Sequence, residues 1–384
     1  MQADAQQQET DDDVAWWRRL PQRPVTATLI ALCLLVYTAS FAAAVSSSAA
    51  PLDTAIQSLW SLEGSEAVLV KLGALDLTRV WVDGEWWRVL TTGFLHGSLL
   101  HLLLNMTALG SIGDWVEHAW GPWRTLLLFL ASSAGGCLAS LMWCESQMVV
   151  GASAGVLGQA AALWLARRFG PENLQTRIAP ISVLSLGILI ILCLSLGVVI
   201  PGIAQAGHLG GLLTGAALGW LLLRKRPAWL AALGGLGIAS GLLAVTLLGR
   251  SPTWQVQYHA MLGFRATVDG QLESAKRHFA AALAREPENA LLLNAVAYQL
   301  ALDGVELDLA QSYVLRALAS DPANPNYLDT LGWVLCRKGE PSAAAPLLRA
   351  AVALTEGVVP EIDAHIDECE SAAVPARSTF HVEH

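Results

Sequence analysis

The chain has 384 residues, of which 54% are hydrophobic and only 14% are charged, and its formal net charge is −9. A soluble domain usually has about a quarter of its residues charged, so this composition argues against an ordinary soluble protein. The negative charge argues against nucleic-acid binding. The six cysteines are scattered without a CxxC pair, so the usual zinc-binding spacing is absent.

Apolar segments dominate the first two-thirds of the chain, and seven of them are about 20 residues long, enough to cross a bilayer. They follow an N-terminal tail, residues 1–24, whose lack of apolar periodicity predicts disorder. The predicted fold class is all-α, with residues 25–250 forming a polytopic bundle of six core helices plus a seventh span. The predicted spans are Val25–Val45, Ser98–Val116, Thr125–Trp143, Gly151–Phe169, Ile178–Ile200, Ala204–Leu223 and Ala228–Leu248.

Arginine and lysine predict the orientation of these spans. Basic clusters precede the first span at Arg18–Arg23, follow the fourth at Arg167–Arg177 and follow the sixth at Arg224–Arg226. All of them fall on one side of an alternating topology, and the positive-inside rule makes that side the cytoplasm. We therefore expect a multi-pass protein of a bacterial inner membrane with a cytoplasmic N-terminus. A cleaved signal peptide is the alternative for the first span, but its apolar part is longer than a typical signal core.

Polar side chains recur at the outer ends of three predicted spans. The second span carries His101 and Asn105, the fourth carries Ser153 and the sixth carries His208. His101 and Asn105 are four residues apart, so they share one helix face. An ionisable residue at membrane depth is a candidate functional residue, because its desolvation must be offset. The alternating topology delivers all four side chains to one depth.

Glycines predict how the spans approach one another. In the sixth span, glycine recurs at every fourth position from Gly207 through Gly211 to Gly219, and such a row lets a neighbouring helix come very close. We expect Gly151 and Gly155 to serve the same purpose in the fourth span. If the two rows face each other, Ser153 and His208 come within reach.

These residue types are the parts of an acyl-transfer site. A serine is a weak nucleophile until a base takes its proton, and histidine is the usual base. His101, Asn105 and the backbone N–H of Ser153 are available as donors to a developing oxyanion. Taken singly, a serine or a Gly-xxx-Gly row in a membrane helix is usually a packing feature, so the joint placement carries the hypothesis. Neither an H-E-x-x-H metal motif nor a phosphate-binding loop is present, and we expect no metal and no cofactor.

At these residues the chain resembles the rhomboid intramembrane proteases, over residues from about Leu72 to Gly219. The resembling motifs are Gly73-Ala74 and Glu85-Trp86-Trp87-Arg88 in the first loop, Phe94 to Ser98 leading to His101-xxx-Asn105, Gly113 with Glu117 and Gly121, Gly151-Ala152-Ser153-Ala154-Gly155, and Ala206-Gly207-His208-Leu209-Gly210-Gly211. The resemblance implies Ser153 as nucleophile and His208 as base, a dyad without a third acid.

The same resemblance implies roles for the surrounding residues. His101, Asn105 and the Ser153 amide would stabilise the oxyanion, and Glu85 and Arg88 would brace the first loop. The residues expected to have structural roles near the site are Gly151, Ala154, Gly207, Gly211, His96, Glu85 and Arg88. One position departs from the family, because Ala154 stands where its nucleophile motif has a second glycine. Since alanine is small and tolerates helical dihedrals, we expect activity to survive this change.

After Arg250 the composition becomes that of a soluble helical domain. The spacing of Ala275, Phe279 and Ala282 returns about 34 residues later, and this resembles tetratricopeptide repeats. We predict three repeats and a capping helix in residues 251–373, followed by a disordered tail, 374–384. Such a stack usually binds peptide segments in its concave groove, and the alternative is a solubilising or dimerising appendage. With seven spans the repeats lie outside, where pairing of Cys336 with Cys369 stays an open alternative.

The sequence therefore predicts an intramembrane serine endopeptidase. It would cut peptide bonds in or near transmembrane segments of membrane-protein substrates, within the lipid bilayer. One alternative is a catalytically silent rhomboid relative that binds membrane clients, and such relatives normally lack the serine or the histidine. A second is a transporter, although no inverted repeat relates the two halves. Labelling by a fluorophosphonate would separate the hydrolase from both.

Overall fold

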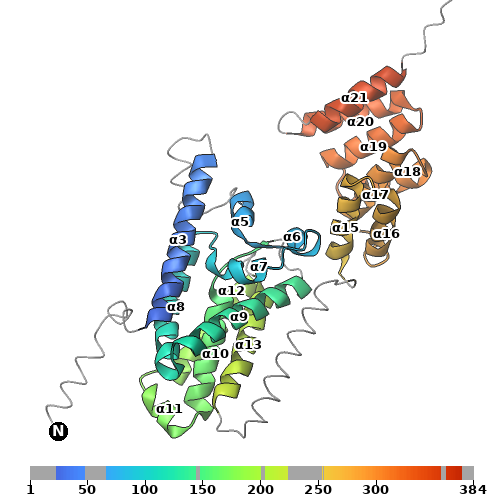
Figure 1. Cartoon of the computed structure of the whole chain (residues 1–384). Helices are drawn as coiled ribbons and strands as arrows, with labels where there is room; N and C mark the ends of the chain where they lie inside the picture. The colour runs from blue at the N-terminus through green and yellow to red at the C-terminus, as the bar shows by residue number, and fades with distance from the viewer. Residues whose placement is uncertain are drawn as a thin grey trace, which may run out of the picture. The chain divides into compact units, whose positions relative to one another are not determined.

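The computed structural model describes residues 23–47, 66–143, 148–199, 204–223, 253, 255–355 and 360–373. They are overwhelmingly helical (Figure 1), so the predicted all-α class is confirmed. Two strands of two residues each, β1 (Leu75–Asp76) and β2 (Met148–Val149), pair in antiparallel fashion and were not predicted. The chain divides into two compact units, Met1–Pro252 and Thr253–His384.

The first unit is a bundle of long apolar helices. Of the described helices, α3, α8, α9 and α13 are long and apolar enough to cross a membrane, while α10 and α12 have 17 residues each. The predicted seventh span, Ala228–Leu248, residues 1–22 of the predicted N-terminal tail and the C-terminal tail, 374–384, lie outside the described residues, while α3 begins at Pro24, inside the predicted tail. The long helices of this unit are α3 (Pro24–Ser47), α8 (Leu99–Trp120), α9 (Pro122–Trp143), α10 (Ser153–Phe169), α12 (Val183–Val199) and α13 (Gln205–Leu223).

Short helices connect the long ones. The connection from α3 to α8 contains α5 (Glu66–Leu72), α6 (Leu77–Trp81), α7 (Arg88–Thr91) and the 3₁₀ helix η2 (Thr92–Phe94), and α11 (Glu172–Arg177) follows α10. The predicted fifth span began at Ile178, but the helix begins at Val183. Pro180 explains the difference, because the residue before a proline is disfavoured in the helical region. The Ser182 hydroxyl then accepts the N–H of Ser185 at 3.2 Å and caps the new helix.

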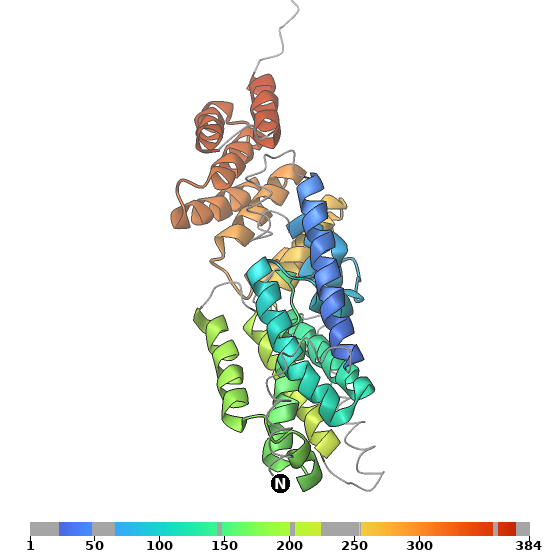
Figure 2. The same ribbon diagram turned by 90° about the vertical axis from the view of Figure 1, so that its left-hand side faces the viewer.

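Helix α10 lies at the centre of this bundle. It packs against α8, α9, α12 and α13, and its side chains from Val156 to Leu163 are buried. Helix α12, in contrast, lies at the edge of the bundle (Figure 2) and leaves Leu184, Ile188 and Ile191 exposed. A helix that is apolar on its outer side is suited to contact with lipid.

The glycine row of α13 packs against α10, but the α10 residues that it contacts are not the predicted ones. A Cβ built on Gly219 would lie 2.6 Å from Ala162 Cα, Gly215 lies against Gly158, and Gly211 lies against Ala154. The prediction that Gly151 and Gly155 form the facing row was therefore wrong. Positions 154, 158 and 162 share one helix side because they are four apart. Gly151 precedes the first residue of α10, and Gly155 faces Ser133 and Phe129 of α9 instead.

The first turn of α3 is fixed by a carboxylate from α8. Glu117 accepts the backbone N–H of Val25 at 3.1 Å and both the N–H and the hydroxyl of Thr26 at 2.9 Å. Gly113, one turn earlier in α8, leaves room for the Thr26 side chain. A negative charge at a helix N-terminus complements the helix dipole and satisfies free N–H groups. The glutamate of the Gly113-Glu117 motif thus joins the first two membrane helices.

The second unit is a stack of helical hairpins: α15 (Val256–Val268), α16 (Leu272–Leu283), α17 (Ala290–Asp303), α18 (Leu307–Ser320), α19 (Pro325–Arg337) and α20 (Pro341–Leu354), followed by α21 (Pro360–Ala373). The first helices of successive hairpins begin at residues 256, 290 and 325, and α21 begins at 360, so the spacing is 34, 35 and 35. Apolar side chains such as Phe279, Val314, Trp333 and Leu348 fill the interior.

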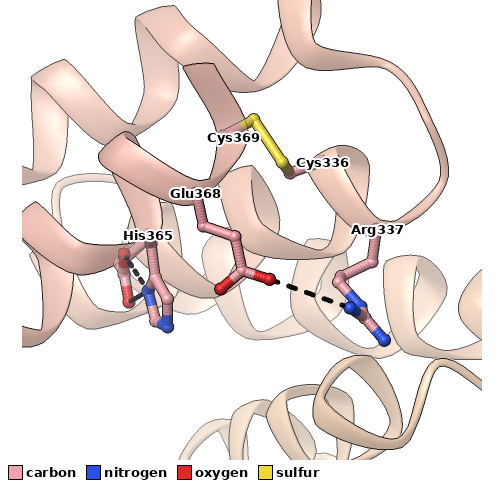
Figure 3. The surroundings of a disulfide bond; sticks show 6 residues. Cys336, Arg337, His365, Glu368 and Cys369 are labelled. Carbon is pink, nitrogen blue, oxygen red and sulfur yellow. Dashed lines mark hydrogen bonds and ion pairs between the residues drawn. A yellow bond between two sulfur atoms is a disulfide. The ribbon is translucent and has the colours of Figure 1, made fainter. Parts of the chain in front are cut away.

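A disulfide fastens α21 to α19 (Figure 3). It joins Cys336 and Cys369, which are 33 residues apart in sequence and have Cα atoms 5.6 Å apart. His365 of α21 lies 3.0 Å from a carboxylate oxygen of Asp329 in α19, and both side chains are buried. The last helix is therefore held to the stack by a covalent bond and by a buried polar pair.

Candidate active site

Ser153 is the first residue of α10, and Ala152 before it already has helical dihedrals. Gly151 has φ of +128°, a region that favours glycine, and its N–H donates to the Thr92 carbonyl at 3.1 Å. Strand β2 lies just before it and pairs with β1 in the first loop. These contacts fix the approach to α10, so that the Ser153 side chain is presented at the helix start.

The structure brings Ser153 and His208 together. The Ser153 Oγ and His208 Nε2 atoms are 2.9 Å apart, across 55 residues of sequence. His208 lies in the first turn of α13, and both side chains are partly exposed. With Nε2 unprotonated, the imidazole accepts the serine O–H, which is the geometry that a general base requires. The close packing of Gly211 against Ala154, next to the serine, allows the two helices to come this near.

His101 of α8 lies over Gly151. A Cβ built on Gly151 would lie 2.8 Å from His101 Nε2 and 3.8 Å from Ser153 Oγ. The imidazole and the serine hydroxyl therefore border the same small space, and glycine is required there both by its φ and by the histidine ring. A donor at this place is suited to an oxyanion formed on a carbonyl that Ser153 attacks.

Asn105 lies one turn further along α8 and is buried. Its amide nitrogen donates to the His101 carbonyl at 3.0 Å, which uses one of its two N–H groups. His96 is buried too, and its ring lies edge-on to that of His101 with centroids 5.1 Å apart. His96 thus packs against the His101 ring, whereas Asn105 contacts the His101 backbone.

Glu85 and Arg88 brace the first loop. Arg88 is only 3% exposed, and its Nε donates to Glu85 at 2.7 Å while Nη1 donates to the Ala74 carbonyl at 2.9 Å. Such burial does not fit an arginine that merely anchors the loop at the membrane surface. The guanidinium instead joins α7 to the segment that leads into β1.

Thr92 was missed by sequence reasoning, although it connects three segments near the serine. Its hydroxyl accepts the Leu75 N–H at 3.2 Å and donates to the Val149 carbonyl, while its carbonyl binds Gly151. The sequence gives no signal for this role of Thr92. All three partners are distant in the chain, and only the fold brings them to the threonine.

The arrangement brings together a serine hydroxyl from α10, an imidazole from α13 and a second imidazole from α8. Within the part of the chain that the structure describes, no three histidine, cysteine, aspartate or glutamate side chains are grouped to hold a metal ion. What these residues can do themselves is activate a hydroxyl and stabilise charge on an acyl oxygen.

The chain is similar in sequence to several known proteins. Residues 83–225 match the family model of the Rhomboid domain. RHOMBOID-like protein 4 of Arabidopsis thaliana is 35% identical over 167 residues, which cover 43% of this chain and 42% of the relative. RHOMBOID-like protein 6, mitochondrial, of the same plant is 33% identical over 161 residues, covering 42% of this chain and 52% of the relative.

A longer match is found with Rhomboid protease GluP of Bacillus subtilis (strain 168), which is 31% identical over 266 residues, covering 66% of this chain and 49% of the relative. The chain spans about half the length of these curated relatives. The comparisons support the rhomboid family for the membrane unit. Together with the apolar helices they support a multi-pass membrane protein.

Proposed function

We propose that this chain, whose membrane unit carries a rhomboid domain, is an intramembrane serine endopeptidase that uses Ser153 as nucleophile and His208 as general base. The observation that carries the proposal is the 2.9 Å separation of Ser153 Oγ and His208 Nε2. Its weight comes from the surroundings. A serine hydroxyl at a helix start, a histidine against it and a second imidazole over the adjoining glycine are the parts that acyl transfer requires.

In the proposed mechanism, His208 Nε2 takes the proton of Ser153 as Oγ attacks the scissile carbonyl carbon. His101, Asn105 and the Ser153 N–H stabilise the oxyanion. The tetrahedral intermediate collapses, the peptide C–N bond breaks and His208 gives its proton to the leaving amine. Water, with His208 again as base, then releases the new carboxyl group and restores the serine.

The proposed substrates are membrane proteins cut in or near a transmembrane segment. The rhomboid family model matches the described helices that border the site, and GluP is named as a protease. A helical segment must unwind before a serine can reach its carbonyl carbon, because the helix shields its own backbone. The proposed sites of cleavage have small residues at the cut and lie in a helix that unwinds easily.

The proposed orientation places the N-terminus in the cytoplasm of a bacterium and the second unit outside its inner membrane. The basic clusters of the sequence support this side for the N-terminus, and the long match to a bacterial protease supports the source. The Cys336–Cys369 disulfide supports an oxidising compartment for the second unit.

The hairpins of the second unit are spaced by 34 and 35 residues. This spacing supports a tetratricopeptide-repeat-like stack that binds an exposed peptide of a substrate or an adaptor.

A fluorophosphonate probe tests the nucleophile directly, because it reacts with an activated serine and not with an ordinary hydroxyl. Purified wild-type protein is expected to be labelled at Ser153, with labelling abolished in Ser153→Ala and in His208→Ala. Ser40→Ala, which removes a buried serine of α3, is the control and should label normally. Absence of labelling in the folded wild type would favour a catalytically silent relative.

Impermeant labelling of a cysteine introduced at the exposed position Ser312 tests the orientation. Reaction in intact cells is expected if the second unit is outside. Reaction only after lysis would place this unit in the cytoplasm. The proposal that it binds an exposed peptide of a substrate or an adaptor outside the membrane would then fail.

A further inference from the structure

Gly136 of α9 occupies the point where three membrane helices meet. A Cβ built on Gly136 would lie 2.6 Å from Ala154 Cβ of α10 and 2.6 Å from the Gly207 carbonyl oxygen of α13. Real Cβ atoms essentially never come closer than 3.0 Å to such neighbours. Gly136 therefore touches the residue that follows Ser153 and the residue that precedes His208 at the same time.

This contact matters because the hydrogen bond between Ser153 and His208 joins two different helices. The length of this hydrogen bond depends on how α10 and α13 are held. Helix α9 packs against both of them, and it does so next to the pair through Gly136. Packed interiors transmit small displacements, because they contain few voids. A methyl group inserted at Gly136 would push Ala154 and Gly207 away, and with them the two reacting side chains.

Ala154 fills the space beside Gly136. Its Cβ would lie only 2.6 Å from a Cβ built on Gly136. Because Gly136 has no side chain, the gap between the two residues holds the methyl group of Ala154 alone. A second methyl group, at position 136, would not fit.

We propose that Gly136 is a positioning residue for the Ser153–His208 pair, an inference that rests on the proposed function. It acts through Ala154 and Gly207 and does not touch substrate. The distance between the serine hydroxyl and the imidazole is set by this contact with α9 as well as by the direct packing of α10 on α13.

The test compares Gly136→Ala with Gly219→Ala, which produces equal crowding elsewhere. A Cβ at Gly219 also meets a neighbour at 2.6 Å, Ala162 Cα, but Gly219 is 11 residues beyond His208, or about 16 Å along the helix. Both variants should lower the melting temperature. Only Gly136→Ala should lower kcat for a model transmembrane substrate, by about 10- to 100-fold with KM nearly unchanged, because a misplacement of about 1 Å costs roughly that much.

Rescue distinguishes positioning from general damage. Adding Ala154→Gly to Gly136→Ala restores a single methyl group to the gap and should recover part of the lost kcat, whereas it should not recover anything lost in Gly219→Ala. Should Gly136→Ala fail to fold, the double variant replaces it. Its remaining crowding of Gly207 should keep its fluorophosphonate labelling of Ser153 several-fold slower than in wild type.

Equal kcat for Gly136→Ala and Gly219→Ala would overturn the inference. Where Gly136→Ala does not fold, wild-type labelling by the double variant would overturn it. The wild type serves as the reference for the proposed function. If it cleaves and Ser153→Ala does not, the function stands whatever Gly136 does. If the folded wild type neither cleaves nor labels, the function fails and the positioning role fails with it.

Discussion

The glycine row of α13 and the glycines of the second unit serve different purposes. In α13 a glycine admits the backbone of the neighbouring helix, as at Gly215 against Gly158 and Gly211 against Ala154. In the second unit a glycine admits a large side chain: a Cβ on Gly263 would lie 2.7 Å from the Phe279 ring, and one on Gly332 would lie 2.7 Å from Leu348 Cγ.

The solvent explains this difference. Lipid is as apolar as leucine, so helices in a bilayer gain little from burying large side chains against each other, and they associate through close packing and hydrogen bonds. In water, burial of large apolar side chains is the main driving force. Close packing in the membrane unit gives the short distance between α10 and α13 that the Ser153–His208 pair requires. Burial of large side chains stabilises the core of the second unit.

The largest expected effect comes from emptying the side-chain-filled core. Phe279→Ala removes a ring that is 1% exposed and should cost the second unit about 3–5 kcal/mol of unfolding free energy. Phe264→Ala is the matched control, since this neighbouring ring is 41% exposed, and it should cost far less. Hydrogen exchange across α15–α18 is the measurement. Equal effects of the two substitutions would contradict a core built on Phe279.

Loss of the disulfide should have the next largest effect and should stay within the second unit. Replacing Cys336 and Cys369 with serine opens a loop of 33 residues and should cost about 2–4 kcal/mol. Hydrogen exchange of α21 should rise, while that of α8–α13 should not change. Reductant should reproduce this result in the wild type and add nothing in the double variant, and an added effect there would point to another reducible bond.

Removing one carboxylate tests the polar contacts that hold the membrane unit. Glu117→Gln keeps the shape but removes the charge that binds the first turn of α3, and should cost about 1–2 kcal/mol. The melting temperature in detergent is the measurement. Glu172→Gln, at an exposed glutamate, is the control, and an equal shift in both variants would exclude a special role for Glu117.

The smallest expected effect is a pH dependence confined to the first hairpin of the second unit. Burial, then the adjacent His259 and Arg277, lower the pKa of His278 below its ordinary value of 6.5, and its Nδ1 lies 3.2 Å from that of His259. Since the folded pKa lies below the unfolded one, this contribution to stability is complete above about pH 6.5 and is lost as the pH falls through the folded value.

Hydrogen exchange of α15 and α16 should accelerate between pH 7 and pH 5 in the wild type and less so in His278→Gln. The membrane unit serves as the internal reference. The same acceleration in His278→Gln would show that other groups cause it.

The sequence predicted the helices and the meeting of Ser153 with His208 because both depend on local patterns: apolar periods, a glycine row and polar residues at one depth. It did not predict which side of α10 faces α13, because the start of that helix depends on the φ of Gly151 and on the Thr92 carbonyl. The cap that Glu117 provides to α3 was missed for the same reason. Its partners are more than 90 residues away, and no local pattern encodes a contact of that kind.

The measurement that tests the central claim most directly is cleavage of a model transmembrane substrate by the purified full-length chain in liposomes. Wild-type protein is expected to release two fragments cut in or near the membrane segment. Ser153→Ala and His208→Ala, with unchanged melting temperatures, should each lower the rate by at least about 1,000-fold. Substantial cleavage by purified Ser153→Ala would contradict the assignment of this serine as the nucleophile.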